Sequence, residues 1–211
     1  MTAAIIGTGG IGSAIARQLA SGGEILRLSS ADTESARTLA AEIGRAAVVA
    51  VDNHDALRGT DAVILALRFG VLKDVIDEIT DSLADKLVVV PSNPVGLDAQ
   101  GNISRLLPEG QPSGEVVAGW LPARARLAMA FGTMKADLFE SSSNRSPEPA
   151  VLFYATDDDR ADEVVEQLIR MAGFEPAKVG GIDKSSRLEV GGDLHDLVVA
   201  PAEARSLIDR A

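Results

Sequence analysis

The sequence predicts an α/β protein with a doubly wound parallel sheet. Two observations support this class. Short, almost wholly apolar runs alternate with segments of helical periodicity through the first 140 residues, and such runs are typical of parallel strands that helices cover on both faces. In addition, the glycine cluster G-T-G-G-I-G at residues 7–12 joins the first apolar run to the first helical pattern. Turns of this kind open many doubly wound folds.

The first fifty residues contain two strand–helix pairs and a third strand. Residues 2–6 are apolar, residues 10–20 repeat apolar side chains at helical spacing, and the pair Gly22-Gly23 ends that helix. The next expected elements are a strand at 24–28, a helix at 32–43 that Gly44 ends, and a strand at 47–50. This order of strands and helices is the one from which parallel sheets are built.

The following residues, up to position 131, continue the alternation. Residues 61–67 contain the run A-V-I-L-A-L, and residues 71–83 carry apolar side chains along one helical face. The remaining elements expected here are a strand at 87–90, a helix at 115–121 and a strand at 126–131. Right-handed crossovers between these strands place helices on both faces of the sheet.

The C-terminal part of the chain is expected to form a small α+β extension. Residues 140–150, E-S-S-S-N-R-S-P-E-P-A, are rich in serine and proline and are predicted to be a linker. Beyond it we expect a strand at 151–155, a helix at 160–172, a short strand at 177–179 and a helix at 202–210. Residues 151–211 are predicted to pack beside the carboxyl edge of the sheet and to form a wall of its cleft.

Composition excludes several classes of function. The chain has 211 residues, a formal net charge of −11 and 3% aromatic residues, so a nucleic acid backbone would be repelled and bases would find few stacking partners. No apolar stretch approaches the roughly 20 residues that span a bilayer, and no basic leader precedes the first strand. The sequence has no cysteine and no metal-ligand spacing. We expect a cytoplasmic protein that binds no nucleic acid, membrane or metal.

The three glycines of the cluster have distinct expected roles. Gly7 allows a sharp exit from the strand, Gly9 leaves room for a pyrophosphate, and Gly12 lets the helix pack closely on the strand. The N-terminus of the following helix offers unpaired N–H groups to phosphates. Residues 1–140 are therefore predicted to be a dinucleotide-binding domain of the Rossmann type. The alternative is a glycine-rich turn that binds no ligand.

The end of the second strand favours NADP over NAD. An NAD-binding fold usually places a carboxylate there, which binds the ribose and repels a 2′-phosphate. This strand ends in L-R-L-S-S-A-D, so Ser29 and Ser30 stand where the acid is expected. Asp32 is interpreted as the N-cap of the next helix, and Arg37 is a possible cation for the phosphate.

The sequence also resembles a known family, the coenzyme F420-dependent NADP oxidoreductases. The resemblance covers nearly the whole chain. It rests on I-I-G-T-G-G-I-G-S-A-I-A-R-Q-L-A, A-V-I-L-A-L-R-F, V-V-V-P-S-N-P-V-G, L-P-A-R-A-R-L-A-M-A-F-G-T-M and D-D-D-R-A-D-E-V-V-E-Q-L-I-R-M-A-G-F-E-P-A-K-V-G. The S-N-P and A-F-G-T segments together are more specific than the glycine motif. The resemblance implies hydride transfer between NADPH and coenzyme F420, and a homodimer.

The resemblance also implies a set of cofactor-binding residues. They are Thr8, Gly9, Gly10, Ile11 and Gly12 in the glycine loop, Ser29 and Ser30, Leu67, Arg68 and Phe69, Ser92, Asn93 and Pro94, and Ala130, Gly132 and Thr133. The sequence departs from the family pattern at two places. Ser30 and Ala31 replace the arginines of the 2′-phosphate clamp, and Gly132 replaces an Asn or His. The second departure indicates a changed or enlarged pocket beside F420.

Two side chains are candidate catalytic residues. A reduced carbonyl or imine usually needs a positioned proton donor. Lys135 follows the A-F-G-T-M segment, and His195 lies in G-G-D-L-H-D between glycines and acids. The alternative is a surface role for each, with His195 paired to Asp193 or Asp196. Transfer between two carrier cofactors demands less of the protein, because the cofactors carry the chemistry.

The remaining polar candidates have simpler expected roles. Tyr154, the sole tyrosine, lies in a strand run and is expected in the core, and His54 is expected to be exposed at a helix start. Arg68 follows the fourth strand, where doubly wound sheets bind ligands, so it either contacts the ligand or forms a surface ion pair.

The sequence is therefore compatible with three functions. The first is an NADP-dependent oxidoreductase that transfers hydride between NADPH and a second carrier cofactor, coenzyme F420. The second is an NADPH-dependent reductase of a small carbonyl, imine or quinone-like acceptor, with Lys135 or His195 as the proton donor. The third is an NADP-binding sensor without turnover.

Overall fold

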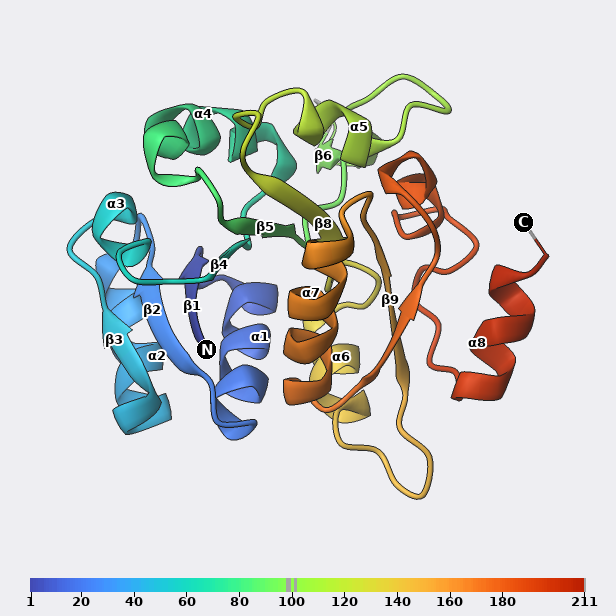
Figure 1. The fold of residues 1–211 in the computed structure, drawn as a ribbon, viewed down its shortest axis with the longest axis horizontal. Helices are drawn as coiled ribbons and strands as arrows, with labels where there is room; N and C mark the ends of the chain where they lie inside the picture. The colour runs from blue at the N-terminus through green and yellow to red at the C-terminus, as the bar shows by residue number, and fades with distance from the viewer. Residues whose placement is uncertain (98–99, 101, 211) are drawn as a thin grey trace.

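A single eight-stranded sheet runs through the computed structural model, which describes residues 1–97, 100 and 102–210 (Figure 1). Its strand order is β10-β9-β8-β5-β4-β1-β2-β3. The strands are β1 (Thr2–Ile6), β2 (Ile25–Ser29), β3 (Ala47–Val49), β4 (Ala62–Leu65), β5 (Leu87–Val90), β8 (Arg126–Ala130), β9 (Val151–Ala155) and β10 (Glu175–Lys178). Neighbouring strands are parallel except β8 and β9, which are antiparallel. The predicted fold class, a doubly wound and mostly parallel sheet, is confirmed.

Helices cover both faces of the sheet. They are α1 (Gly10–Ser21), α2 (Thr33–Ile43), α3 (Asn53–Ala56), α4 (Phe69–Ile79), α5 (Ser113–Ala118), α6 (Ala136–Ser142), α7 (Asp159–Met171) and α8 (Pro201–Ile208). One apolar core contains residues of α1, α2, α6 and α7, and the other contains residues of α3, α4, α5 and α8. The sheet is therefore buried on both sides, as its apolar strands require.

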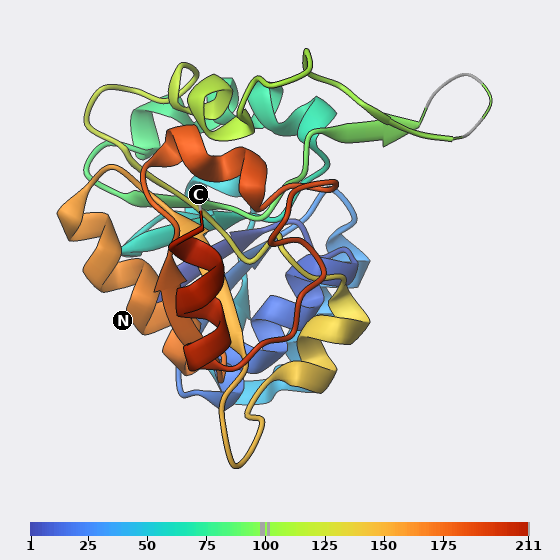
Figure 2. The ribbon, with the colours of Figure 1, turned by 90° about the vertical axis from the view of Figure 1, so that its right-hand side faces the viewer.

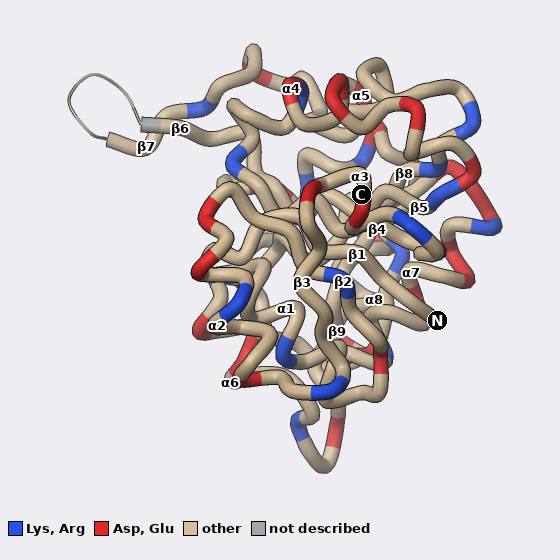
Figure 3. The backbone as a smooth tube through the Cα atoms, turned by 90° about the vertical axis from the view of Figure 1, so that its left-hand side faces the viewer, with Lys and Arg blue, Asp and Glu red and all other residues tan. Residues whose placement is uncertain are grey.

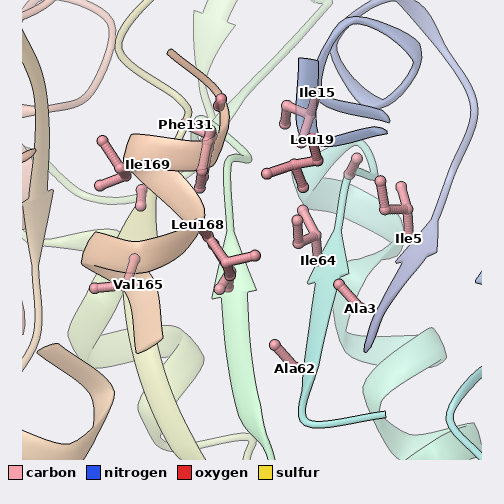
Figure 4. Close-up of a cluster of buried hydrophobic side chains, with 14 of the residues drawn as sticks. Ala3, Ile5, Ile15, Leu19, Ala62, Ile64, Phe131, Val165, Leu168 and Ile169 are labelled. Carbon is pink, nitrogen blue, oxygen red and sulfur yellow. The ribbon is translucent and has the colours of Figure 1, made fainter. Parts of the chain in front are cut away.

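The strand sequences explain this two-sided burial. In β1, Ala3 and Ile5 face one core while Ala4 and Ile6 face the other, because successive side chains point to opposite faces. In the first core, Ile5 and Ile64 of the sheet lie near Ile15 and Leu19 of α1, and the side chains of α7 lie on the opposite side of the view (Figure 4). A strand with an apolar residue at every position is stable only in such a sandwich of helices.

Several boundaries differ from the sequence prediction for identifiable reasons. The strand expected at 126–131 ends at Ala130 because Phe131 adopts a left-handed backbone, with φ of 65°. The expected linker at 140–150 begins inside α6, whose Phe139 packs on Phe131 and Phe174. The helix expected at 71–83 begins earlier and ends at Ile79, followed by a short 3-10 turn, η2 (Thr80–Ser82). Two further 3-10 turns are η1 (Gly44–Ala46) and η3 (Ile182–Arg187).

Between β5 and α5 the chain forms a hairpin that the sequence analysis did not predict. Strands β6 (Val95–Leu97) and β7 (Ile103–Arg105) pair antiparallel and project from the body as an arm (Figure 2). The arm begins directly after the S-N-P segment. Acidic and basic residues are interspersed along the backbone on the side that carries β2 and β3 (Figure 3). No described helix has the length and apolarity needed to cross a membrane.

Candidate functional site

Two adjoining cavities lie at the carboxyl ends of the central strands. The first, of about 570 Å³, is formed by the segments that follow β1, β2, β3 and β4. The second, of about 300 Å³, is formed by segments after β4, β5 and β8 and by Val190 and His195. Leu67 and Arg68 line both cavities. The strand order reverses between β1 and β4, so the cavities lie at the switch point where doubly wound sheets bind ligands.

The glycine loop enters the first cavity, and its geometry explains each glycine. A Cβ on Gly7, whose φ is 102°, would lie 2.3 Å from the carbonyl oxygen of Ala66. A Cβ on Gly12 would lie 2.0 Å from the carbonyl oxygen of Gly7. A Cβ on Gly9 would meet no protein atom within 4 Å. Gly7 and Gly12 are thus required by close backbone packing, whereas Gly9 faces open space.

Hydroxyl groups hold this loop in place. Ser13 Oγ donates to the carbonyl oxygen of Thr8 over 2.8 Å, and the Thr8 and Ser35 hydroxyls share a hydrogen bond of 2.8 Å. Helix α1 begins at Gly10 with neither a side-chain cap nor an acidic residue in its first turn. Its first N–H groups lack intrahelical partners and carry the positive end of the helix dipole. The start of α1 is therefore suited to an anion.

The two serines after β2 both line the first cavity, but only one has a protein partner among the described residues. Ser29 is buried, and its Oγ donates to Asn53 Oδ1 over 2.7 Å. Asn53 in turn donates to the Glu78 carboxylate. Ser30 is partly exposed, and its hydroxyl has no partner in the described chain. A ligand at this end would find the Ser30 hydroxyl available.

The charged residues near these serines take the following places. Asp32 accepts hydrogen bonds from the backbone N–H groups of Glu34 and Ser35, which confirms it as the N-cap of α2. Arg37 lies 3.6 Å from the Glu34 carboxylate and does not line the cavity, and its role as a cation for the 2′-phosphate stays a prediction. Arg68 is exposed at the junction of the two cavities and forms no ion pair with any described residue.

The second cavity is bounded by loops that Asn93 ties together. Asn93 Nδ2 donates to the carbonyl oxygen of Gly132 over 2.9 Å, and Asn93 Oδ1 accepts from the backbone N–H of Val190 over 2.7 Å. Ser92 Oγ donates to the carbonyl oxygen of Leu67. Both the nitrogen and the oxygen of the Asn93 side-chain amide therefore have protein partners. Asn93 fixes the distance between three segments that are remote in the sequence.

Gly132 is required by its backbone neighbour. A Cβ at this position would lie 2.4 Å from the carbonyl oxygen of Pro91. A larger side chain would push apart the loops after β5 and β8. The preceding Phe131 is buried, and its left-handed backbone turns the chain toward Pro91. The sequence analysis expected Gly132 to mark a changed or enlarged pocket. The structure adds that a glycine is needed here because the backbone of Pro91 lies so close.

Lys135 and His195 both line the second cavity, and Asp196 lies between them. Lys135 Nζ is 3.4 Å from Asp196 Oδ2, and His195 Nε2 is 3.7 Å from Asp196 Oδ1. His195 Nδ1 lies 3.2 Å from the carbonyl oxygen of Leu188. Asp196 has a φ of 56°, and its backbone N–H donates to the carbonyl oxygen of Thr133 over 2.7 Å. Asp193, the other expected partner of His195, pairs with Arg187 instead.

The other predicted site residues divide into three groups. Phe69, Ser92 and Ile11 line the second cavity, and Thr8 lines the first. Ala130 and Thr133 line a small cavity of about 20 Å³ behind Gly132. Gly10, Gly12 and Pro94 line none of these three cavities.

The remaining titratable candidates lie outside the site. Tyr154 is fully buried and donates to Glu166 Oε1 over 2.8 Å, and burial raises its pKa far above the ordinary value. It is a core residue, as expected. His54 is exposed, with Nδ1 3.1 Å from Ser82 Oγ. Within the described part of the chain, no group of three or more His, Asp or Glu residues could hold a metal ion.

Comparison with known proteins finds a family whose model matches the N-terminal part of the chain. Residues 2–94 match the model of a family described as NADP oxidoreductase, coenzyme F420-dependent. This segment contains the glycine loop, the two serines after β2, Arg68 and the S-N-P segment. The expected resemblance to this family is confirmed over these residues.

Several solved structures share the fold of this chain over nearly its whole length. A hypothetical protein from Sinorhizobium meliloti has a TM-score of 0.84 at 26% identity, with 95% of each chain covered. A candidate F420-dependent NADP-reductase from Arthrobacter sp. FB24 has a TM-score of 0.78 at 18% identity, over 94% of this chain and 98% of that chain. A reductive aminase from Aspergillus terreus, solved with NADPH and ethyl-5-oxohexanoate, has a TM-score of 0.60 at 18% identity. The present chain matches 60% of that enzyme with 99% of its own length.

Proposed function

We propose that this protein transfers hydride between NADPH and a second carrier cofactor, coenzyme F420. One observation carries the proposal: two adjoining cavities meet at Arg68, and the glycine loop opens into the larger of them. A dinucleotide needs such a two-part cleft, with one part for each nucleoside. The family description and the name of the Arthrobacter relative support F420 as the partner.

The larger cavity fits the adenosine half of NADP(H). The open space at Gly9 and the N-terminus of α1 suit the pyrophosphate. Ser29 and Ser30 border the place for the 2′-phosphate, and Ser30 has a hydroxyl to donate. Arg68 lies between the cavities and is the cation available to the phosphates. In this proposal the phosphates are held by backbone N–H groups, serine hydroxyls and Arg68. Such local contacts are needed because the net charge of −11 gives no overall attraction for an anion.

The smaller cavity fits the nicotinamide and the hydride acceptor. When bound, NADPH supplies the hydride. The chain's own contribution is alignment: Asn93 holds the loops that carry Gly132 and Val190, and these loops bound the cavity. We infer that Asn93 acts by shaping this wall. Residues 151–211 then supply part of the acceptor side through Val190 and His195.

A second candidate function is the reduction of a small carbonyl, imine or quinone-like compound. Lys135 and His195 favour it, because both line the smaller cavity and either could donate a proton. A sensor that binds NADP without turnover is the third candidate. The homodimer and the cytoplasmic location stay predictions, the first of which sedimentation of the purified chain tests.

The test is a titration with NADPH and NADH, followed by addition of F420 while absorbance at 340 nm is recorded. Tight NADPH binding with F420-dependent oxidation supports the proposal. NADPH binding without F420 turnover, but with oxidation by a ketone, imine or quinone, favours the second candidate. Binding without any turnover favours the sensor, and absence of binding contradicts all three.

A further inference from the structure

We propose that His195 is the proton donor to the acceptor reduced in the smaller cavity, and that Asp196 is a positioning residue for both His195 and Lys135. This inference rests on the proposed function and deepens it. It defines the acceptor as one whose reduced form gains a new O–H or N–H group. Carbonyl, imine and deazaflavin acceptors all meet this condition.

The hydrogen bonding of the imidazole is the first argument. His195 Nδ1 lies 3.2 Å from the carbonyl oxygen of Leu188. A carbonyl only accepts, so Nδ1 carries a hydrogen. That leaves Nε2 as the atom that gains and loses a proton. The imidazole lines the cavity with a side chain that is only 11% exposed, so Nε2 is held near the cavity and largely away from bulk solvent.

The placement of Asp196 is the second argument. Its carboxylate lies between the two side chains, 3.7 Å from His195 Nε2 and 3.4 Å from Lys135 Nζ. A left-handed backbone is uncommon for a residue other than glycine, and aspartate is one of the few that tolerate it. Asp196 adopts it with a φ of 56°, and the hydrogen bond from its N–H to Thr133 anchors it. This backbone conformation and its hydrogen bond bring the carboxylate to His195 and Lys135.

The third argument comes from the other charged groups. Arg68 lines the same cavity without an ion pair to the described residues. Glu189 is adjacent in the chain to the cavity residue Val190, but its carboxylate is bound by Arg105 and by the N–H of Ser113. Arg187, on the other side of Leu188, is paired with Asp193. Among the described residues, the charged groups near His195 are therefore Asp196 and, through it, Lys135, with Arg68 in the lining of the same cavity.

The proposed step is a balanced proton transfer. The donor is the imidazolium form of His195, in which both ring nitrogens carry a hydrogen. Its N–H bond at Nε2 breaks and leaves the neutral Nδ1–H imidazole, and an O–H or N–H bond forms on the acceptor atom that receives the electron pair. NADPH is oxidised and the acceptor is reduced. The imidazole regains its proton from solvent.

The first test needs no turnover. The chain has two histidines, so histidine ¹⁵N NMR of the full-length protein gives two imidazoles, which His195→Gln and His54→Gln assign. We expect neutral His195 as the Nδ1–H tautomer. We also expect its signals to move when NADP⁺ fills both cavities and to stay fixed with 2′,5′-ADP, which fills the adenosine side alone. An Nε2–H tautomer, or no response to saturating NADP⁺, overturns the inference. Absence of NADP⁺ binding overturns the proposed function itself.

The second test uses the acceptor that the enzyme turns over. His195→Ala should lower kcat by about 10²- to 10⁴-fold with the NADPH Kd unchanged, and added imidazole should restore part of the rate. His54→Gln, the matched control, should keep wild-type kcat. Asp196→Asn keeps the left-handed backbone, because Asn tolerates it, and should lower kcat while His195 keeps the Nδ1–H tautomer that the Leu188 carbonyl fixes. Equal kcat for His195→Ala and wild type overturns the inference.

Discussion

Substitution of Gly9 distinguishes a phosphate-binding loop from a turn without a ligand. A methyl group at this position meets no protein atom within 4 Å, and its φ of −71° and ψ of −172° suit alanine. Gly9→Ala should therefore change the free energy of unfolding by less than about 1 kcal/mol. The same methyl group enters the space assigned to the pyrophosphate. Loss of one charge-assisted N–H bond to phosphate costs about 1.5–3 kcal/mol, which weakens NADPH binding by about 10- to 150-fold.

Isothermal titration measures the NADPH Kd, and thermal unfolding followed by circular dichroism measures stability. Gly12→Ala is the contrasting variant. Its Cβ would lie 2.0 Å from the carbonyl oxygen of Gly7, so it should lower Tm because α1 must move away from β1. If Gly9→Ala unfolds like the wild type and also binds NADPH as tightly, the loop is only a turn and the reasoning is refuted.

Three further predictions concern specificity, packing and pH. Ser30→Asp should weaken NADPH binding by more than about tenfold and leave the NADH Kd nearly unchanged, since a carboxylate repels a 2′-phosphate; equal losses for both nucleotides would contradict the assignment. Gly132→Asn should destabilise the fold by about 1–3 kcal/mol in thermal unfolding, because its Cβ would overlap the Pro91 carbonyl; an unchanged Tm would contradict this. Glu24 is buried, and desolvation raises its pKa above the ordinary value of 4.5. The contribution of Glu24 to the free energy of unfolding is therefore greatest at low pH. It falls as the pH rises from 4.5 through the raised pKa of the folded state, because the buried carboxyl group then loses its proton. Glu24→Gln should remove that loss, so its stability relative to the wild type should rise from pH 4 to pH 7 in urea titrations; a constant difference would contradict it.

Most of the sheet could be predicted because its strands are apolar at every position. The strands at 87–90 and 151–155 were located with their observed bounds, since turn and charged residues flank each run. Helix α6 was missed because its second half reads as E-S-S, which is typical of a linker. Its stability comes from Phe139, which packs on rings from Phe131 and Phe174. Contacts of this kind between remote residues leave no local signal.

The larger cavity, which the glycine loop enters, could be predicted from the sequence, whereas the cluster at the smaller cavity could be predicted only in part. The glycine loop and Ser30 belong to one strand–helix–strand unit, so local spacing placed them. The cluster of Lys135, His195 and Asp196 joins residues about sixty positions apart and depends on the left-handed turn at Asp196. The sequence raised Asp196 only as a surface partner of His195. The fold brings its carboxylate to the cavity that Lys135 also lines.

The central claim is that the two cavities form one dinucleotide cleft, and a crystal structure with bound NADP⁺ tests it most directly. The account predicts a single nucleotide with its 2′-phosphate at Ser30, its pyrophosphate over Gly9 beside Arg68, and its nicotinamide in the cavity bounded by Asn93 and His195. A nucleotide that leaves the smaller cavity empty, or that binds away from the glycine loop, would contradict the account.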